Sequence, residues 1–204
     1  MVKKYEKAGV AAVCIEDKTF PKQNSLLKNG KQELLSEKDF VAKIIAAREA
    51  KKDSSFMIIA RVESLIAKLG MDDAIVRADA YEKAGADAIV IHSKEKTPDE
   101  IFEFCETWKG TIPIVIIPTS YGNITTDEII EHKIKMVIYA NQTLRASHIH
   151  ISKLLGELKN NNSLSKIKQE MSTMEDIFKL QQMYGIKKEE EDIENELKKM
   201  GYID

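Results

Sequence analysis

Cysteine is scarce in this chain of 204 residues, in which only Cys14 and Cys105 occur. Two cysteines cannot form a disulfide framework, and neither has a partner at a spacing typical of a metal site. The sequence therefore favours a protein of a reducing, cytoplasmic compartment.

Excess charge and long apolar runs are also lacking. Lys and Arg number 31 and Asp and Glu 33, so the net charge is −2, which argues against a dedicated nucleic-acid-binding protein. The longest apolar runs, Val10–Ile15 and Ile112–Ile117, are far shorter than the roughly 18 residues of a membrane helix. Residues 1–9 contain no apolar segment of a secretory signal. We expect a globular protein whose partners are neither nucleic acids nor membranes.

One segment occurs twice, as YEKAGVAAVCIEDK at Tyr5–Lys18 and as YEKAGADAIVIHSK at Tyr81–Lys94. In each copy a helix is predicted to end at a glycine, Gly9 or Gly85, which can take the left-handed conformation of a helix cap. A short, β-branched apolar run follows and stops at polar residues. Continuous apolarity over this length indicates a strand of a parallel sheet that is covered on its outer face.

The same pattern predicts three more strands, at Phe56–Arg61, Ile112–Ile117 and Lys135–Ala140. The predicted helices are Asp39–Lys52, Met71–Ala84, Pro98–Lys109 and Thr126–His132. Strands that alternate with helices make an α/β protein. Five strand units fit either a complete open sheet or part of an eight-stranded barrel whose first three units precede Met1, and the pattern alone leaves both possibilities open.

Capping signals mark three helix starts. Thr97 is predicted to cap a helix that has Pro98 as its first residue, while Thr125 with Glu128 and Ser172 with Glu175 have the spacing of capping boxes.

After Arg145 the pattern changes, and helices are predicted at Met171–Gly185 and Lys187–Met200. We expect two domains, residues 1–158 with the sheet and residues 159–204 with the C-terminal helices.

Polar side chains stand at the carboxyl ends of the predicted strands, where functional residues of parallel α/β folds gather. Because side chains alternate along a strand, Glu16, Arg61 and His92 can converge at one edge of the sheet. A carboxylate, a guanidinium and an imidazole there suit a divalent cation and a doubly charged anion. The alternative is a structural ion-pair cluster that also includes Glu63, with His92 as a merely hydrogen-bonded histidine.

Asp17–Leu35 carries no helix or strand pattern. A segment of about twenty such residues inside a compact domain is typical of a functional lid. Its Lys18, Lys22, Asn24 and Ser25 favour a lid that faces a phosphate group, and the alternative is a surface insertion.

Several motifs resemble one known family. The sequence EDKTFPKQNS at Glu16–Ser25 resembles the signature of the phosphoenolpyruvate mutase family, in the isocitrate lyase/phosphoenolpyruvate mutase superfamily. Five further segments resemble motifs of the family and occur in the family's order: IARVES at Ile59–Ser64, AGADAIVIHSK at Ala84–Lys94, IPTSYG at Ile117–Gly122, ANQTLRAS at Ala140–Ser147 and IFKLQ at Ile177–Gln181. The resemblance implies a truncated (β/α)8 TIM-type barrel of about five C-terminal βα units, followed by C-terminal helices.

The resemblance also implies a chemistry: the Mg²⁺-dependent interconversion of phosphoenolpyruvate and 3-phosphonopyruvate, the carbon–phosphorus bond-forming step of phosphonate biosynthesis. The residues that match the family's motifs are Lys22, Asn24, Arg61 and His92 as catalytic residues, Ser25 and Leu26 with Arg61 and His92 as substrate-binding residues, and Glu16 as a water-mediated metal ligand.

Other activities stay open at this point. Phosphonopyruvate hydrolase, which gives pyruvate and phosphate, is the nearest alternative within the superfamily, whereas the carbon–carbon lyases have a lid cysteine that Lys18–Ser25 lacks. Roughly the first third of the family's enzymes, including most Mg²⁺ ligands, has no counterpart here. The chain could therefore be a non-catalytic fragment, and we expect no mutase activity from it alone. The family further implies dimers or tetramers that exchange a helix at Ile177–Gln181.

Overall fold

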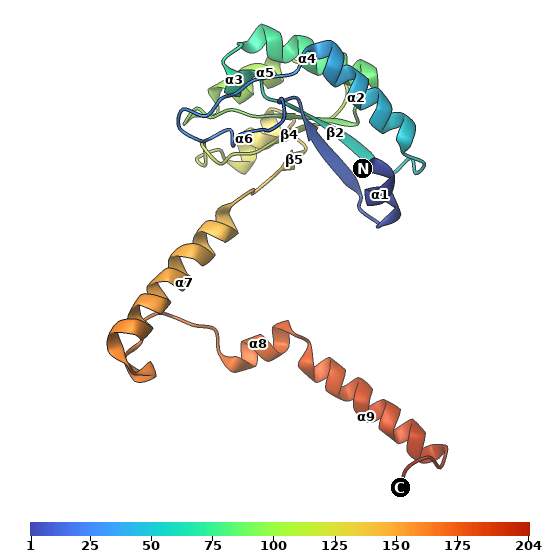
Figure 1. Ribbon diagram of the computed structural model, residues 1–204, viewed down its shortest axis with the longest axis vertical. Coiled ribbons are helices and arrows are strands. Elements are labelled where there is room, and N and C mark those ends of the chain that lie inside the picture. Colours follow the sequence, from blue (N-terminus) through green and yellow to red (C-terminus); the bar gives the residue numbers. More distant parts are fainter. The chain divides into compact units, whose positions relative to one another are not determined.

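The computed structural model describes residues 1–204, which divide into two compact units, Met1–Gln142 and Thr143–Asp204. The first unit contains one sheet of five parallel strands in sequential order (Figure 1). The strands are β1 (Ala12–Glu16), β2 (Met57–Val62), β3 (Ala88–Ile91), β4 (Ile114–Ile116) and β5 (Met136–Val137). The predicted α/β class is therefore confirmed.

Helices connect these strands. They are α1 (Val2–Lys7), α2 (Glu37–Ala50), α3 (Ser64–Ala67), α4 (Met71–Ala84), α5 (Asp99–Thr107) and α6 (Thr126–Glu131). Figure 1 shows α2, α4 and α5 on the same face of the sheet. Because crossovers are right-handed, a strand order that runs in one direction places the helices on one face. A doubly wound open sheet instead reverses its strand order, so the observed order is that of a barrel wall.

Side chains of each strand alternate between the two faces of the sheet. Ile58 and Ile89 belong to the main apolar core beneath the helices. Ile59 and Val90 belong to a smaller apolar cluster on the opposite, inner face. The residues that continue this inner face past the smaller cluster are Arg61 on β2 and His92 beyond β3, as the sequence predicted.

The predicted strands agree in position with the observed ones, but β5 is much shorter than the predicted Lys135–Ala140. β5 pairs on one side only, with β4, and this pairing covers Val115 with Met136 and Ile116 with Val137. A strand whose neighbour has three residues can form only a short ladder.

Two of the three predicted capping signals need correction. Thr125 and Glu128 form the predicted capping box of α6. In α5, however, Pro98 itself occupies the N-cap position and Thr97 makes no capping bond to the backbone. The capping box of α8 (Met174–Leu180) is formed by Thr173 and Asp176, one residue later than the predicted Ser172 and Glu175.

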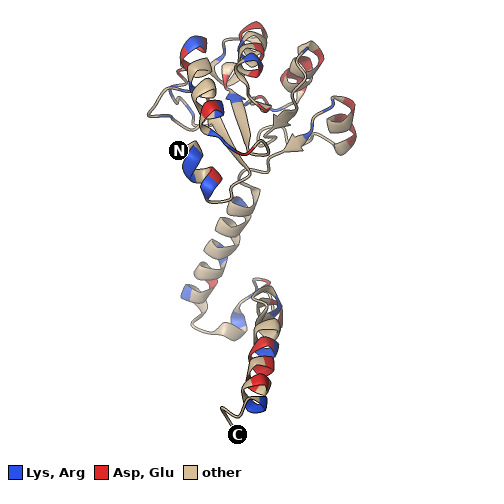
Figure 2. Ribbon diagram, turned by 90° about the vertical axis from the view of Figure 1, so that its right-hand side faces the viewer, with Lys and Arg blue, Asp and Glu red and all other residues tan.

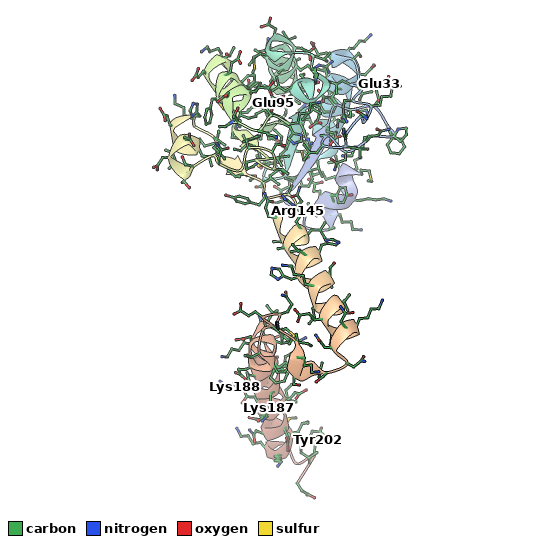
Figure 3. The ribbon with its side chains drawn as sticks, turned by 90° about the vertical axis from the view of Figure 1, so that its left-hand side faces the viewer. Glu33, Glu95, Arg145, Lys187, Lys188 and Tyr202 are labelled. Carbon is green, nitrogen blue, oxygen red and sulfur yellow. The ribbon has the colours of Figure 1, made fainter.

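The second unit is helical. It consists of α7 (Gln142–Asn161, which starts at the end of the first unit), the 3-10 turn η1 (Leu164–Lys166), α8 (Met174–Leu180) and α9 (Met183–Lys199). Arg145, where the sequence pattern changes, stands in the first turns of α7 (Figure 3). None of these elements has a buried residue. The proposed domain boundary at residue 158 and the exchange of Ile177–Gln181 between subunits stay predictions.

Charges of both signs are distributed over the outer helices of the first unit and along α9 (Figure 2). No helix of the chain combines the length and the apolarity needed to cross a membrane.

The repeated glycines close α1 and α4 in the same way. Gly9 and Gly85 have φ of +79° and +100°. In each copy the amide after the glycine donates a hydrogen bond to a tyrosine carbonyl five residues earlier, from Val10 to Tyr5 over 3.1 Å and from Ala86 to Tyr81 over 3.0 Å. The surroundings differ, because a Cβ on Gly85 would lie 2.5 Å from Cδ of Arg48, whereas one on Gly9 would meet nothing within 4 Å.

We therefore expect Gly9→Ala to lower the free energy of unfolding by ~1 kcal/mol, from backbone strain alone. Gly85→Ala should lower it by ~2 kcal/mol, since Arg48 must also give up its hydrogen bond to the Ala84 carbonyl. Urea unfolding followed by the fluorescence of Trp108, the single tryptophan, measures both values. Equal losses would show that the contact with Arg48 has no effect.

Candidate active site

The carboxyl ends of β1, β2 and β3 bring three predicted site residues together. Glu16 and Arg61 are paired in the register of β1 and β2, and Arg61 Nε lies 3.8 Å from Glu16 Oε2. Arg61 Nη2 lies 2.8 Å from His92 Nδ1. The predicted convergence of carboxylate, guanidinium and imidazole is therefore present, while the catalytic roles of these residues stay predictions.

Glu63 occupies the centre of this cluster and is fully buried. Its Oε1 lies 2.7 Å from Arg61 Nε and 2.8 Å from His92 Nδ1. Burial raises the pKa of Glu63, but the hydrogen bond from His92 and the positive charge of Arg61 outweigh it and hold the pKa well below its usual range. The ion-pair cluster that the sequence left as an alternative is thus real, and it includes the same arginine and histidine.

His92 is oriented by this carboxylate. An ionised carboxylate can only accept, so the hydrogen bond at 2.8 Å between Glu63 and His92 requires the proton on Nδ1. Arg61 Nη2 can only donate and therefore lies near that nitrogen without a hydrogen bond to it. Nε2 of His92 makes no hydrogen bond within the protein, and in the doubly protonated imidazolium this nitrogen can donate to a bound anion.

The segment Asp17–Leu35 forms a loop with a narrow neck. Lys18 and Leu34 form a single antiparallel bridge, the Leu35 amide donates to the Asp17 carbonyl over 2.8 Å, and the Thr19 amide donates to the Glu33 carbonyl over 2.9 Å. Apart from this bridge the segment has no regular structure, as predicted.

The tip of the loop contacts the strand ends. Lys22 Nζ lies 2.8 Å from Glu16 Oε2. Ser25 is buried, and its hydroxyl accepts from Lys18 Nζ over 2.7 Å and donates to Glu63 Oε2. The loop therefore lies in a closed position over the cluster.

Asn24 and Leu26 do not join this cluster. Asn24 Oδ1 accepts from the Leu26 amide over 2.9 Å and so shapes the turn of the loop tip, and the Leu26 side chain is exposed. Their predicted contacts with substrate stay predictions.

A second buried network, which our sequence analysis missed, holds the base of the loop. Asp17 is fully buried, and its Oδ2 accepts from the Tyr81 hydroxyl over 2.8 Å and lies 3.5 Å from Arg77 Nη1. Arg77 also donates to the Leu35 carbonyl over 3.0 Å. Both ends of the loop are thus tied to α4.

The sequence carried a signal for this network. Because side chains alternate along a strand, Asp17 is expected on the face opposite Glu16, toward the helices. A carboxylate that is buried there needs hydrogen-bond donors. Arg77 and Tyr81 stand four positions apart and share one face of α4.

A magnesium ion would find one suitable ligand among these residues. Mg²⁺ keeps several waters and takes one or two carboxylates, and Glu16 offers one carboxylate at the strand ends. The chain has no group of three His, Cys, Asp or Glu side chains arranged to hold a metal ion. Glu16 therefore fits a water-mediated contribution to a magnesium site and does not form one by itself.

A cavity of about 540 Å³ lies elsewhere. It is lined by Trp108, His132, Lys133 and the segment Ile112–Ile114 at the amino end of β4. It contains no residue of the strand-end cluster.

Comparison with known proteins identifies relatives of one kind. Residues 1–159 match the family model described as phosphoenolpyruvate phosphomutase. The phosphoenolpyruvate phosphomutase of Tetrahymena pyriformis is 42% identical over 181 residues, which cover 89% of this chain and 60% of the relative. The phosphonopyruvate hydrolase of Variovorax sp. (strain Pal2) is also 42% identical, over 182 residues that cover 89% of this chain and 63% of the relative.

Solved structures agree. Phosphoenolpyruvate phosphomutase from Streptomyces platensis subsp. rosaceus superposes with a TM-score of 0.89 at 40% identity, over 94% of this chain and 66% of that one. A phosphonopyruvate hydrolase complex with oxalate and Mg²⁺ gives a TM-score of 0.82 at 38% identity, over 92% of this chain and 64% of that one. The chain spans about 60% of the length of the curated relatives it matches.

Asp17 makes stability depend on pH in a specific way. Burial raises its pKa from 3.8 to about 6. The native state then holds this proton more tightly than the unfolded chain, so the contribution of Asp17 to stability falls as pH rises from about 4 to about 6. Asn at this position does not titrate. We expect the stability of Asp17→Asn relative to the unmodified chain to increase between pH 4.5 and pH 7.

Urea unfolding of both proteins at these two pH values, followed by Trp108 fluorescence, measures the change. Other carboxylates titrate in both proteins and cancel in the difference. A difference in stability that is the same at both pH values would contradict the raised pKa.

Proposed function

This chain belongs to the phosphoenolpyruvate phosphomutase family, and from this premise we propose that it contributes to an active site that interconverts phosphoenolpyruvate and 3-phosphonopyruvate. The observation that carries the proposal is the convergence of Arg61, His92 and the loop residue Lys22 at the strand ends. The Glu-Asp-Lys run at Glu16–Lys18 and the Asn24-Ser25 pair are both intact in that loop.

The substrate of such a reaction is a small, multiply charged anion. Arg61 supplies a planar guanidinium that suits phosphoryl and carboxylate oxygens. His92 supplies Nε2, because Glu63 holds its other ring nitrogen. Lys22 supplies a further cationic group from the loop. Its side chain is more than half exposed and is able to move from Glu16 to a substrate oxygen.

Positioning and charge matter most in this chemistry. Transfer of a phosphoryl group passes through a loose transition state, for which positive groups around the phosphoryl oxygens are more effective than a strong base. Arg61, His92 and Lys22 would hold the phosphoryl group while it leaves the enol oxygen and bonds to carbon 3 of the same molecule. Asn24 would orient it from the loop.

A metal fits beside these residues. When bound, Mg²⁺ supplies Lewis-acid stabilisation of the pyruvate enolate, and Glu16 would hold it through water. A related phosphonopyruvate hydrolase has been crystallised with oxalate and Mg²⁺, which supports this proposal.

Exclusion of water separates the mutase from its alternative, hydrolysis of phosphonopyruvate to pyruvate and phosphate. The closed loop, with Ser25 buried against Glu63, favours retention of the phosphoryl group and hence the mutase. The hydrolase remains the second candidate because relatives of both activities are 42% identical to this chain.

Phosphorus NMR distinguishes the two activities. We expect a version of the chain that is extended to the length of its relatives, supplied with phosphonopyruvate and Mg²⁺, to produce the phosphoenolpyruvate signal. Inorganic phosphate as its main product would assign the hydrolase instead, and an unchanged phosphonopyruvate signal from this extended version would contradict the proposed activity.

Arg61→Lys tests the role of the guanidinium. The variant keeps the positive charge and loses the planar fork that binds two oxygens, so kcat/KM of the extended version should fall at least about 100-fold, the equivalent of ~3 kcal/mol. Arg48→Lys is the matched control, since Arg48 pairs with the exposed Glu49 on α2. Equal activity of the two variants would exclude Arg61 from substrate binding.

A further inference from the structure

The Glu63 carboxylate divides its two oxygens between two different parts of the protein. Oε1 binds the strand-end residues Arg61 and His92, at 2.7 and 2.8 Å. Oε2 binds the loop residues Ser25 and Lys18, and Lys18 Nζ lies at 3.0 Å. One fully buried group therefore contacts both the loop and the two side chains proposed to hold the substrate anion.

The two loop contacts differ in kind. Lys18 belongs to the neck, where its backbone bridges to Leu34, and its Nζ contacts Glu63 from there while also donating to Ser25 of the tip. Ser25 belongs to the tip. Its hydroxyl is the tip's only side-chain bond to Glu63, and it also accepts from Arg61 Nη2 over 3.3 Å. Opening of the loop therefore removes one donor from Oε2 and one acceptor from Arg61 together.

Burial makes the loss of Ser25 consequential. A carboxylate that is shielded from water is stable only when donors satisfy its lone pairs. Without Ser25, Oε2 keeps only Lys18 as a partner, and the carboxylate is free to rotate. Rotation would move Oε1, and with it the hydrogen bonds that orient Arg61 and His92.

We propose that Glu63 is a positioning residue that couples closure of the loop Asp17–Leu35, through Ser25, to the alignment of Arg61 and His92. This inference rests on the proposed function, since alignment matters only if these residues hold a substrate anion. The hydrogen bond from the Ser25 hydroxyl to Glu63 then holds the loop closed, and we call this bond the latch. Arg61 and His92 reach their anion-binding geometry when the loop is closed over them.

Hydrogen exchange of the substrate-free chain tests the latch. In Ser25→Ala, amides of residues 19–33 should exchange about tenfold faster than in the unmodified chain, the effect of losing one net hydrogen bond. Glu63→Gln should act in the same direction. Ser25→Ala is the decisive variant because it leaves Arg61, His92 and Lys18 on the buried carboxylate and so retains the fold.

Glu33→Gln is the matched control. Glu33, labelled in Figure 3, is a carboxylate of the same loop. Its side chain is 56% exposed and pairs with the exposed Lys31, so loop exchange should not change. Exchange in Ser25→Ala that equals that of this control would overturn the latch.

Product analysis tests the coupling. In the extended version, supplied with phosphonopyruvate and Mg²⁺, Ser25→Ala should form a larger share of inorganic phosphate relative to phosphoenolpyruvate, since a loosened loop admits water. A merely structural defect would reduce both products in the same ratio, and an unchanged ratio beside faster loop exchange would refute the coupling. Absence of phosphoenolpyruvate with the extended version that carries no substitution would contradict the proposed function alone, because the exchange result does not depend on substrate.

Discussion

The buried charge of Glu63 is the constraint on which the strand-end site depends. No water reaches this carboxylate, so the protein must supply its hydrogen-bond donors. It does so from β2, from the end of β3 and from the loop, through Arg61, His92, Ser25 and Lys18. The separate polar residues at the strand ends are thereby joined into one network with fixed geometry, which is the condition for holding a small anion in one orientation.

Three consecutive residues at the junction of β1 and the loop have three different roles. Glu16 faces the inner side of the sheet beside Arg61, Asp17 faces α4, and Lys18 reaches back to Glu63. The alternation of the strand predicts the first two directions, and it placed Glu16, Arg61 and His92 together from the sequence alone. It could not predict that Lys18 bonds Glu63, because the partners stand 45 positions apart and the loop's path depends on contacts of Asp17 and Leu35 with Arg77.

The fold was predictable where local patterns are strong. The repeated Tyr-Glu-Lys-Ala-Gly segment and the continuous apolar runs located every strand, and α4 has the predicted bounds Met71–Ala84. Local patterns were insufficient elsewhere. Two overlapping pairs, Ser172 with Glu175 and Thr173 with Asp176, have identical spacing, so only the backbone could decide between them. α7 was missed although Leu144, Ile151 and Leu155 have the spacing of one helix face, and these three side chains are exposed.

The neck of the loop has a consequence for how reactions diverge on one scaffold. Its two ends are fixed to α4 through Asp17 and Leu35, and between them Lys22 and Ser25 contact Glu16 and Glu63. Substitutions elsewhere in residues 19–33 would change the surface that the loop presents and leave the sheet and the buried cluster intact. A loop anchored in this way can therefore diverge while its scaffold is retained.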